Sequence, residues 1–535
     1  MSVMPHLQEQ TPETVLREQF GLSEFRPLQR EAIEAVLNGQ DTFVLLPTGG
    51  GKSLCFQIPA LILPKCTIVV SPLISLMSDQ VKAISHKSSD LTAATLNSSM
   101  KESERRNVLE QLYFGKLKLL YLAPETLLSP LGLQLLQEKY ISLIAIDEAH
   151  CISQWGHDFR PEYGKLSIVR QYLPNTPIIA LTATADETTR KDIIERLDLR
   201  NPTVLIGDFD RPNLTLTVRR GYKKEEKIRA IQQHIEAHER GSTGIIYCTK
   251  RDDTETLASK LNKMGFRAMP YHAGLPARSR DLVHQMFVGD QIDVICATVA
   301  FGMGIDKSNV RWVIHYNMPR NIESYYQEIG RAGRDGKPAS TILFYSYGDI
   351  FILDKLLEEG GRTELNQQKM EYMKRFCESS ICRRRILLSY FGQEAHHNCG
   401  NCDVCLSPQT DLFDATIILQ KALSTIIRAG EKISIDTTVE ILRGSRRYEI
   451  LNRGYHHLST YGIGLDLSYR EWKDYIFQMV QLGLLRIDYS QGYSLQVTPS
   501  GRIALKGEEP TMLHRVEVQP FTKVKKSSNQ SKTRK

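Results

Sequence analysis

Short apolar runs alternate with amphipathic segments between residues 40 and 210. Each run predicts a buried strand followed by a turn; the runs are DTFVLLP, CTIVVSP, LKLLYLAP, SLIAIDEAH and TPIIALTATA. The segments between them, such as ESERRNVLEQLYF, have the periodicity of a helix. Strands that alternate with helices in this way predict a parallel sheet with helices on both faces.

The same alternation begins again after a junction predicted at residues 207–222. Further strands are expected at STGIIYCTK, FRAMPYH, IDVICATVA, VRWVIHYN and STILFYS, which span residues 242–346. Residues 348–395 then have a helical pattern, and residues 411–505 combine helix-like segments with a hairpin pattern around Gln491-Gly492. Helices followed by one hairpin indicate a winged-helix module.

The composition is that of a soluble globular protein with several domains, since 41% of the 535 residues are hydrophobic and 24% are charged. No apolar run is long enough to span a membrane, and the first residues lack a signal-peptide pattern, which predicts a cytoplasmic protein with no membrane partner. The net charge is +7, but residues 511–535 hold seven Lys or Arg and one Glu, so the tail supplies +6. The tail is expected to be disordered, either as a solubilising end or as a nonspecific polyanion contact.

A predicted strand, a glycine-rich loop and a predicted helix meet at TGGGKS (48–53). The backbone N–H groups of such a loop point at phosphate oxygens, and the helix N-terminus adds its dipole. Lys52 is expected to reach the β- and γ-phosphates and Ser53 to bind Mg²⁺. The nucleotide-binding residues predicted here are Thr48, Gly49, Gly50, Gly51, Lys52 and Ser53. The common pattern has a glycine where this chain has Leu46.

An acidic pair, Asp147 and Glu148, stands at the end of the apolar run SLIAIDEAH. Such a pair alone is often a solvated strand end. Together with the upstream GKS, it indicates that Asp147 binds Mg²⁺ through water and that Glu148 orients and deprotonates the attacking water.

The second α/β unit is expected to supply the other half of a nucleotide site. SYYQEIGRAGRDG (324–336) carries Gln327, Arg331 and Arg334, whose charges would neutralise the transferred phosphoryl group. VAFGMGIDKSNV (299–310) adds Gly304 and Asp306, placed to contact ribose or magnesium. Two half-sites on two domains allow hydrolysis to drive opening and closing, which is the basis of a motor.

Four cysteines, Cys382, Cys399, Cys402 and Cys405, have the short spacings of a zinc site. On spacing alone, His396 or His397 could replace Cys382 as the first ligand. Four thiolates close the coordination shell, which indicates a structural metal rather than a catalytic one.

Two further segments have the composition of nucleic-acid contacts. HCISQWGHDFRPEY (150–163) offers stacking faces and a cation, although a plain core cluster would bury its aromatic residues. ILRGSRRYEILNRGYHHLSTYGIG (441–464) has arginines suited to a phosphate backbone, or to a solvated helix face. The nucleic-acid-binding residues predicted in them are Trp155, His157, Phe159, Arg160, Arg443, Arg446 and Arg447.

With these motifs in order, residues from about 10 to 505 resemble the RecQ family of ATP-dependent DNA helicases in superfamily 2. The resemblance also rests on FGLSEFRPLQREAI (20–33), VSPLISLMSDQ (70–80), YLAPE (121–125), LTATA (181–185) and YCTKRD (247–252). It implies that Arg26 and Gln29 recognise adenine, although Leu22 replaces the usual stacking aromatic residue. It also implies that residues 150–163 couple DNA contact to hydrolysis and that the four cysteines bind one Zn²⁺.

The resemblance implies an α/β fold with two tandem RecA-like domains that have parallel sheets, a helical zinc-binding domain and a winged-helix domain. The expected boundaries are 1–207, 208–346, 347–408 and 409–508, with a basic tail at 509–535. The winged helix would bind duplex DNA, and the hairpin at 487–496 would separate strands with Tyr489 or Tyr493. The family's further C-terminal helicase-and-RNase-D-like domain is expected to be absent.

The sequence therefore predicts a DNA-stimulated ATPase that unwinds DNA in recombination and repair, with 3′-to-5′ polarity implied by the resemblance. Its expected cofactors are ATP, Mg²⁺ and structural Zn²⁺. Its expected partners are single-stranded and duplex DNA, with single-stranded-DNA-binding protein and other repair factors, at the nucleoid if the protein is bacterial. The alternatives are an RNA helicase of the same superfamily and an annealing protein that has lost its motor, and intact Lys52, Glu148 and Arg334 argue against the second.

Overall fold

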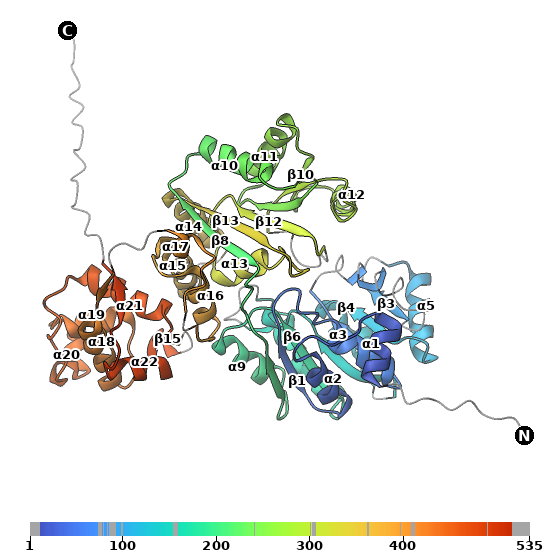
Figure 1. The fold of residues 1–535 in the computed structure, drawn as a ribbon. Coiled ribbons are helices and arrows are strands. Elements are labelled where there is room, and N and C mark those ends of the chain that lie inside the picture. The colour runs from blue at the N-terminus through green and yellow to red at the C-terminus, as the bar shows by residue number, and fades with distance from the viewer. Residues whose placement is uncertain are drawn as a thin grey trace, which may run out of the picture. The chain divides into compact units, whose positions relative to one another are not determined.

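The computed structural model describes residues 11–515, apart from 73–76, 79, 83, 85–91, 98–99, 138, 154–158, 240, 300, 302–306, 361–362, 396, 408–411 and 489–490 (Figure 1). Most of the predicted basic tail therefore lies outside the described residues. The chain forms two compact units. One takes in the chain as far as Pro408 together with Gln481–Gly483 and Ile487–Tyr493, and the other holds the rest of the chain after Pro408.

The first unit begins with a sheet of seven described strands in the order β3-β4-β2-β5-β6-β1-β7, and neighbouring strands in it run parallel. The strands are β1 (Thr42–Leu45), β2 (Cys66–Val70), β3 (Ala93–Leu96), β4 (Leu119–Leu122), β5 (Ile141–Ile146), β6 (Ile178–Thr182) and β7 (Thr203–Ile206). Helices α1, α2 and α3 cover one face, where Leu16, Ile33 and Phe56 pack against Val44 and Val69.

The helical segments of this part are α1 (Pro12–Phe20), α2 (Gln29–Leu37), α3 (Leu54–Ile62), α5 (Glu102–Tyr113), α6 (Pro124–Leu127), α7 (Pro130–Leu135), η1 (Ala149–Ile152), η2 (Tyr163–Ile168), α8 (Val169–Tyr172) and α9 (Glu187–Arg196). Among them, η1 and η2 are 3₁₀ helices, and α6 and α8 are α-helices of a single turn.

A second parallel sheet of six described strands has the order β10-β11-β9-β12-β13-β8. Its strands are β8 (Leu214–Arg220), β9 (Thr243–Tyr247), β10 (Ala268–Tyr271), β11 (Val294–Ala297), β12 (Val310–His315) and β13 (Ala339–Tyr345). Its helices are α10 (Lys224–Glu236), α11 (Arg251–Lys263), α12 (Ala277–Val288) and α13 (Ile322–Ile329). Helices α10 and α11 pack on one face, and α13 lies on the other (Figure 1). The ring of Tyr325 in α13 contacts that of His315 in β12, with centroids 5.1 Å apart.

In the two parallel sheets, three of the described strands were not expected from the apolar runs: β3, β7 and β8. Each of these three strands lies at an edge of its sheet. Along β7 and β8, more buried and less buried residues alternate. An edge strand is covered less completely than a central one, so its sequence alternates instead of forming a continuous apolar run. The predicted junction at 207–222 therefore contains a strand, because β8 pairs with β13.

The helical zinc-binding segment follows β13 and consists of α14 (Tyr347–Gly360), α15 (Glu364–Glu378), α16 (Arg383–Tyr390) and α17 (Asp403–Leu406). Arg383 is buried at the start of α16, where it forms a double hydrogen bond to Asp403, with both distances 3.0 Å, and also donates to the Phe376 carbonyl. A buried guanidinium is tolerated only with such partners. Arg383 thus connects α15, α16 and α17.

The second unit is mainly helical, with short strand pairs β14–β17 and β15–β16. Its elements are β14 (Leu412–Asp414), α18 (Thr416–Arg428), α19 (Ile435–Leu442), α20 (Tyr448–Asn452), η3 (Tyr455–His457), α21 (Tyr469–Gln481), β15 (Leu485–Asp488), β16 (Ser494–Val497), α22 (Pro499–Leu505) and β17 (Met512–His514). Trp472 is fully buried and donates from Nε1 to the Gly464 carbonyl at 2.7 Å. The predicted hairpin appears as β15 and β16, and Tyr489 lies outside the described residues.

We expect Gly244→Ala to destabilise the second sheet by about 1–3 kcal/mol, because a core overpacked by one methyl group must shift. A Cβ at Gly244 would lie 2.0 Å from the ring of Trp312, which is fully buried on the neighbouring strand. Calorimetry should show a lower unfolding temperature. Gly348→Ala is the matched control, because its Cβ would meet only the Ser346 hydroxyl, at 3.7 Å; an equal loss in both variants would contradict this explanation.

Candidate active site and zinc centre

The glycine-rich loop follows β1, close to the start of α3. Gly49 and Gly51 have φ angles of +82° and +76°, a left-handed conformation that other residues adopt at a cost. A Cβ on Gly51 would also lie 2.3 Å from Nε2 of Gln29. The loop therefore needs glycine both for its backbone conformation and for the close approach of α2.

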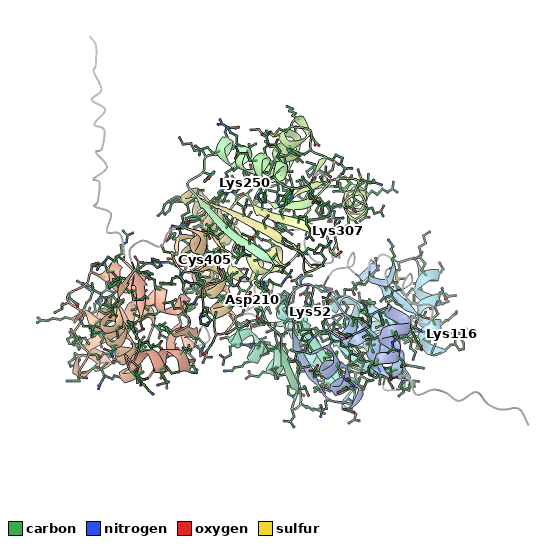
Figure 2. The ribbon with its side chains drawn as sticks, in the orientation of Figure 1. Lys52, Lys116, Asp210, Lys250, Lys307 and Cys405 are labelled. Atoms are coloured by element: carbon green, nitrogen blue, oxygen red, sulfur yellow. The ribbon has the colours of Figure 1, made fainter. Side chains whose placement is uncertain are left out.

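Lys52 lies at the base of this loop (Figure 2), where its Nζ donates to the carbonyls of Leu46 and Pro47 at 3.1 and 3.4 Å. Burial lowers the pKa of Lys52, and the negative charges of Glu148 and Asp147 oppose that shift. Leu46, which departs from the common loop pattern, thus contributes a backbone carbonyl that any residue could supply.

The sheet order places the acidic pair near the loop, because β6 lies between β1 and β5 and all three strands are parallel. Asp147 is 8% exposed and accepts a hydrogen bond from the Glu148 amide at 3.0 Å. Burial and the neighbouring Glu148 raise the pKa of Asp147 to about 7, and Lys52 opposes the rise. Glu148 itself has a φ of +48°, an uncommon conformation often found at functional sites.

His150 lies between the acidic pair, which follows β5, and the end of β6. Its Nδ1 lies 2.9 Å from the Thr182 hydroxyl at the end of β6 and 3.3 Å from a Glu148 carboxylate oxygen. Burial lowers the pKa of His150 to about 3, with further lowering by Lys52 and Arg160. His150 is therefore neutral at physiological pH, so its ring packs beside the Glu148 carboxylate without forming an ion pair with it.

Arg26 and Gln29, expected to read adenine, both contact the back of the glycine-rich loop. Gln29 Nε2 donates to the carbonyls of Gly50 and Gly51 at 3.2 and 3.0 Å, and Arg26 donates to the Gly49 carbonyl. Gln29 Oε1 also accepts from the Arg26 amide at 2.9 Å. These contacts brace the loop from the side opposite its N–H groups.

The arginine-bearing turn after α13 meets the same loop. A Cβ on Gly49 would lie 3.2 Å from Cγ of Arg334, and the charge of Arg334 lowers the pKa of Lys52. Arg331 is buried and hydrogen bonds to Tyr247, while Gln327 is partly buried on α13. The structure thus brings Arg334 to the glycine-rich loop and places Arg331 beside Tyr247 at the end of β9.

One residue in this region was missed by the sequence reasoning. Arg211 donates from Nη1 to the Thr48 carbonyl at 3.2 Å and from Nη2 to the carbonyls of Ala332 and Gly333 at 2.9 Å each. It lies in the segment interpreted as a junction, within GDFDRPNL. The only signal available was a conformationally restricted Arg-Pro pair between two α/β units.

The site fits a nucleoside triphosphate with Mg²⁺. The Thr48 hydroxyl is buried and has no hydrogen-bond partner among the described residues, so it can accept a polar ligand atom. Lys52 supplies a cation, and Asp147 and Glu148 supply hard oxygen ligands of the kind that Mg²⁺ prefers.

Several predicted site residues lie outside the described part of the chain: Trp155, His157, Gly304 and Asp306. Phe159 is described and is 37% exposed, which excludes full burial of that ring. Arg160 donates from Nη1 to the Pro72 carbonyl at 2.9 Å, and its amide donates to the Cys151 carbonyl at 2.9 Å. Arg160 thus links the segment after the acidic pair to the segment after β2.

The four predicted cysteines come together, with all ligand sulfurs within 4.8 Å of one another. Cys402 Sγ lies 3.4 Å from that of Cys405 and 4.0 Å from that of Cys382. His397 is exposed and is not part of this group, and His396 lies outside the described residues. The set suits tetrahedral Zn²⁺, because Zn²⁺ bound at about 2.3 Å to four thiolates holds them near these separations.

The predicted DNA-binding arginines of the second unit have different surroundings. Arg443 donates to the Leu467 carbonyl, Arg446 is exposed, and Arg447 is 72% exposed while pairing with Glu440 at 2.5 Å. Arg446 and Arg447 therefore remain available at the surface beside α20, whereas Arg443 serves a local backbone contact.

Four family models match the chain. The DEAD/DEAH box helicase family matches residues 26–193, the helicase conserved C-terminal domain 226–336, the RecQ zinc-binding family 347–406 and the RQC domain 409–521. The fold and these matches define a helicase whose two parallel sheets are followed by zinc-binding and winged-helix modules, which confirms the predicted fold class.

Relatives of high similarity identify the family. The chain is 44% identical over 522 residues to the ATP-dependent DNA helicase RecQ of Haemophilus influenzae, a match that covers 97% of this chain and 83% of the relative. It is 40% identical over 501 residues to the enzyme of the same name from Bacillus subtilis, covering 93% and 84%. The chain belongs to the RecQ family of ATP-dependent DNA helicases. It uses ATP with Mg²⁺ and holds a structural Zn²⁺.

Solved structures share the fold at low sequence identity. Dbp5 of S. cerevisiae bound to RNA and ADP BeF3 is 17% identical, with a TM-score of 0.53, and the match covers 69% of this chain and 98% of that one. The Mycobacterium smegmatis helicase Lhr bound to ssDNA and AMP-PNP is also 17% identical, with a TM-score of 0.52, covering 92% and 61%. Within the described residues, no helix is both long enough and apolar enough to cross a membrane.

We expect Cys402→Ala to lose bound zinc and to lower the soluble yield, because three thiolates leave the coordination shell open. Cys402 is fully buried within the cluster. Zinc per folded chain, measured by atomic emission, should fall well below one. Cys377→Ala removes an equally buried thiol that is not part of the cluster, so it should keep its zinc; normal zinc content in Cys402→Ala would refute the ligand assignment.

Proposed function

We propose that this protein is a motor that hydrolyses ATP to move 3′-to-5′ along single-stranded DNA and to separate duplex DNA in recombination and repair. The observation that supports it most is the meeting of Lys52, the acidic pair and Arg334 at one glycine-rich loop, with contributions from both sheets. Loops from two sheets that share one nucleotide site can open and close with its chemistry, as a stepping motor requires.

The proposed roles follow the chemistry of each side chain. The loop N–H groups from Thr48 to Ser53 would bind the phosphates, and Lys52 would neutralise the β- and γ-phosphate oxygens. Ser53 and Asp147 would hold the Mg²⁺, which neutralises charge on the triphosphate. Glu148, which lies beside neutral His150, would orient the attacking water and take its proton.

Further residues are proposed to complete the nucleotide site. Arg331, Arg334 and Gln327 would stabilise charge that develops on the transferred phosphoryl group. Arg26 and Gln29 would recognise the base from the position where they brace the loop, and Gly304 with Asp306 would contact ribose or magnesium.

DNA contacts are proposed at two places. Trp155, His157 and Phe159 would stack on bases, and Arg160 would link that contact to the segment after β2. Arg446 and Arg447, with Arg443, would contact the phosphates of duplex DNA through the second unit. The exposure of Phe159 supports the first site.

The four cysteines are proposed as the zinc ligands, with a role in folding alone. Single-stranded-DNA-binding protein and other repair factors are proposed partners, and a DNA substrate implies a cytoplasmic location at the nucleoid if the protein is bacterial. The predicted domain boundaries, at residues 207, 346, 408 and 508, remain proposals.

An RNA helicase is the second candidate, because the tetrapeptide DEAH alone does not exclude it and a protein solved with RNA shares the fold. The RecQ zinc-binding and RQC matches favour DNA, because the named relatives with this arrangement are DNA helicases. Stimulation of hydrolysis by single-stranded RNA but not DNA would favour RNA instead.

We expect Lys52→Ala to abolish ATP hydrolysis and the unwinding of 3′-tailed duplexes while preserving DNA binding, because the phosphates lose their buried cation. Hydrolysis should be measured with single-stranded DNA and with RNA, and unwinding with 3′-tailed and 5′-tailed duplexes. Lys116→Ala, at an exposed position (Figure 2), is the control and should behave as the parent protein. Unwinding that persists in Lys52→Ala would overturn the motor.

A further inference from the structure

The segment that joins the two sheets, residues 207–213, contacts the candidate active site chiefly through the side chain of Arg211. The guanidinium of Arg211 reaches four backbone carbonyls: that of Thr48 at 3.2 Å, Gly330 at 3.4 Å, and Ala332 and Gly333 at 2.9 Å each. Thr48 begins the phosphate loop, and the other three belong to the turn that carries Arg331 and Arg334. One side chain therefore joins the two loops that must act together.

Arginine suits this task better than any other residue. Its guanidinium is planar and offers five N–H donors in a fixed fork, so one group can satisfy carbonyls of two separate loops. Asn213 adds a bond from the same segment to the Gly333 carbonyl at 2.9 Å. Within the described part of the chain, every hydrogen bond donated by the Arg211 guanidinium goes to a backbone carbonyl. Its influence on nucleotide chemistry would therefore come through the position of these loops.

The backbone that carries Arg211 is itself held by residues that directly follow α16 in the zinc-binding segment. Gln393 accepts a hydrogen bond from the Phe209 amide at 2.9 Å and donates to Asp208 at 2.7 Å. The ring of Phe209 stacks on that of Phe391, with centroids 4.6 Å apart and planes within 4° of parallel. These contacts fix the two residues immediately before Asp210 and Arg211.

Two further bonds complete this hold. Arg384 of α16 pairs with Asp210 at 3.1 Å and donates to the Leu214 carbonyl at 2.6 Å (Asp210 is labelled in Figure 2). Tyr326 of α13 donates to the Phe209 carbonyl at 2.7 Å. The joining segment is thus anchored on both sides of Arg211, by a helix that begins at one of the clustered cysteines.

We propose that Arg211 is a positioning residue for ATP hydrolysis: it holds the arginine-bearing turn 330–334 against the phosphate loop, and the zinc-binding segment holds Arg211 in turn. This inference rests on the proposed function, since it concerns the same nucleotide site. It gives the zinc-binding segment a second role, because Gln393 and Phe391 hold the backbone that places Arg211 at the nucleotide site.

Substitution of Arg211 should separate turnover from nucleotide binding. In Arg211→Ala we expect kcat for DNA-stimulated hydrolysis to fall about tenfold to a hundredfold, a part of the 10³–10⁵-fold contribution of an arginine finger. KM for ATP should stay within about threefold, because the loop N–H groups and Lys52 are retained. Arg211→Lys keeps the charge but not the fork, so it should recover only part of the loss.

Arg200→Ala is the matched control for an arginine that donates to a backbone carbonyl. Arg200 is exposed and bonds to the Pro174 carbonyl at 2.9 Å, away from both loops. It should keep the parental kcat and KM. Zinc content and unfolding temperature, measured on every variant, show whether each protein is folded. If Arg211→Ala does not fold, the kcat of Arg211→Lys tests the role of Arg211.

Gln393→Ala tests the link to the zinc-binding segment. Removal of its two bonds should lower kcat less than Arg211→Ala does, with normal zinc content. In the double variant Arg211→Ala/Gln393→Ala, the loss should be close to that of Arg211→Ala alone, because Gln393 acts through Arg211.

The outcomes distinguish this inference from the proposed function. A parent protein with no DNA-stimulated hydrolysis contradicts the function itself. If the parent is active, a kcat within about twofold of parental in Arg211→Lys or Arg211→Ala overturns the role of Arg211. Losses that multiply in the double variant overturn the role of Gln393.

Discussion

The buried cation of Lys52 is the constraint on which the active site depends. An ammonium group taken out of water needs partners, and here it has two backbone carbonyls and the charges of Asp147 and Glu148. Those partners stand at the ends of β1 and β5, which the sheet order places on either side of β6. The first sheet can therefore be understood as the frame that brings a cation and two carboxylates to one edge.

The second sheet and the segment before it contact this site through two arginine side chains. Arg334 packs on Gly49, and Arg211 bonds to Thr48 and to the turn beyond α13. The described contacts are hydrogen bonds and the packing of one arginine, which break and re-form more easily than an extended apolar interface does. A large apolar interface would resist the opening that a motor needs.

Much of this arrangement could be predicted from the sequence. Central strands are buried on both faces and so appear as continuous apolar runs, and the residues that follow them, such as Lys52 and Asp147, inherit a position at the same sheet edge. The cysteine spacing likewise predicted the thiol cluster. The domain boundaries and the individual roles of the site residues stay predictions.

Other features had no signal in the sequence. Edge strands such as β8 alternate in burial and have no continuous apolar run. The contacts of Arg211 depend on carbonyls more than 100 positions away, which no local pattern reveals. Spacing alone also left His397 open as a zinc ligand, and only the fold shows it exposed and apart from the four sulfurs.

The central claim is that both sheets build one hydrolytic site, and the most direct test is the turnover of Arg334→Ala at saturating ATP and single-stranded DNA. If Arg334 stabilises charge on the transferred phosphoryl group, its loss should lower turnover at least about a hundredfold and should leave nucleotide affinity almost unchanged. Turnover within about threefold of the parent protein would contradict the claim, because the second sheet would then contribute nothing to the chemistry.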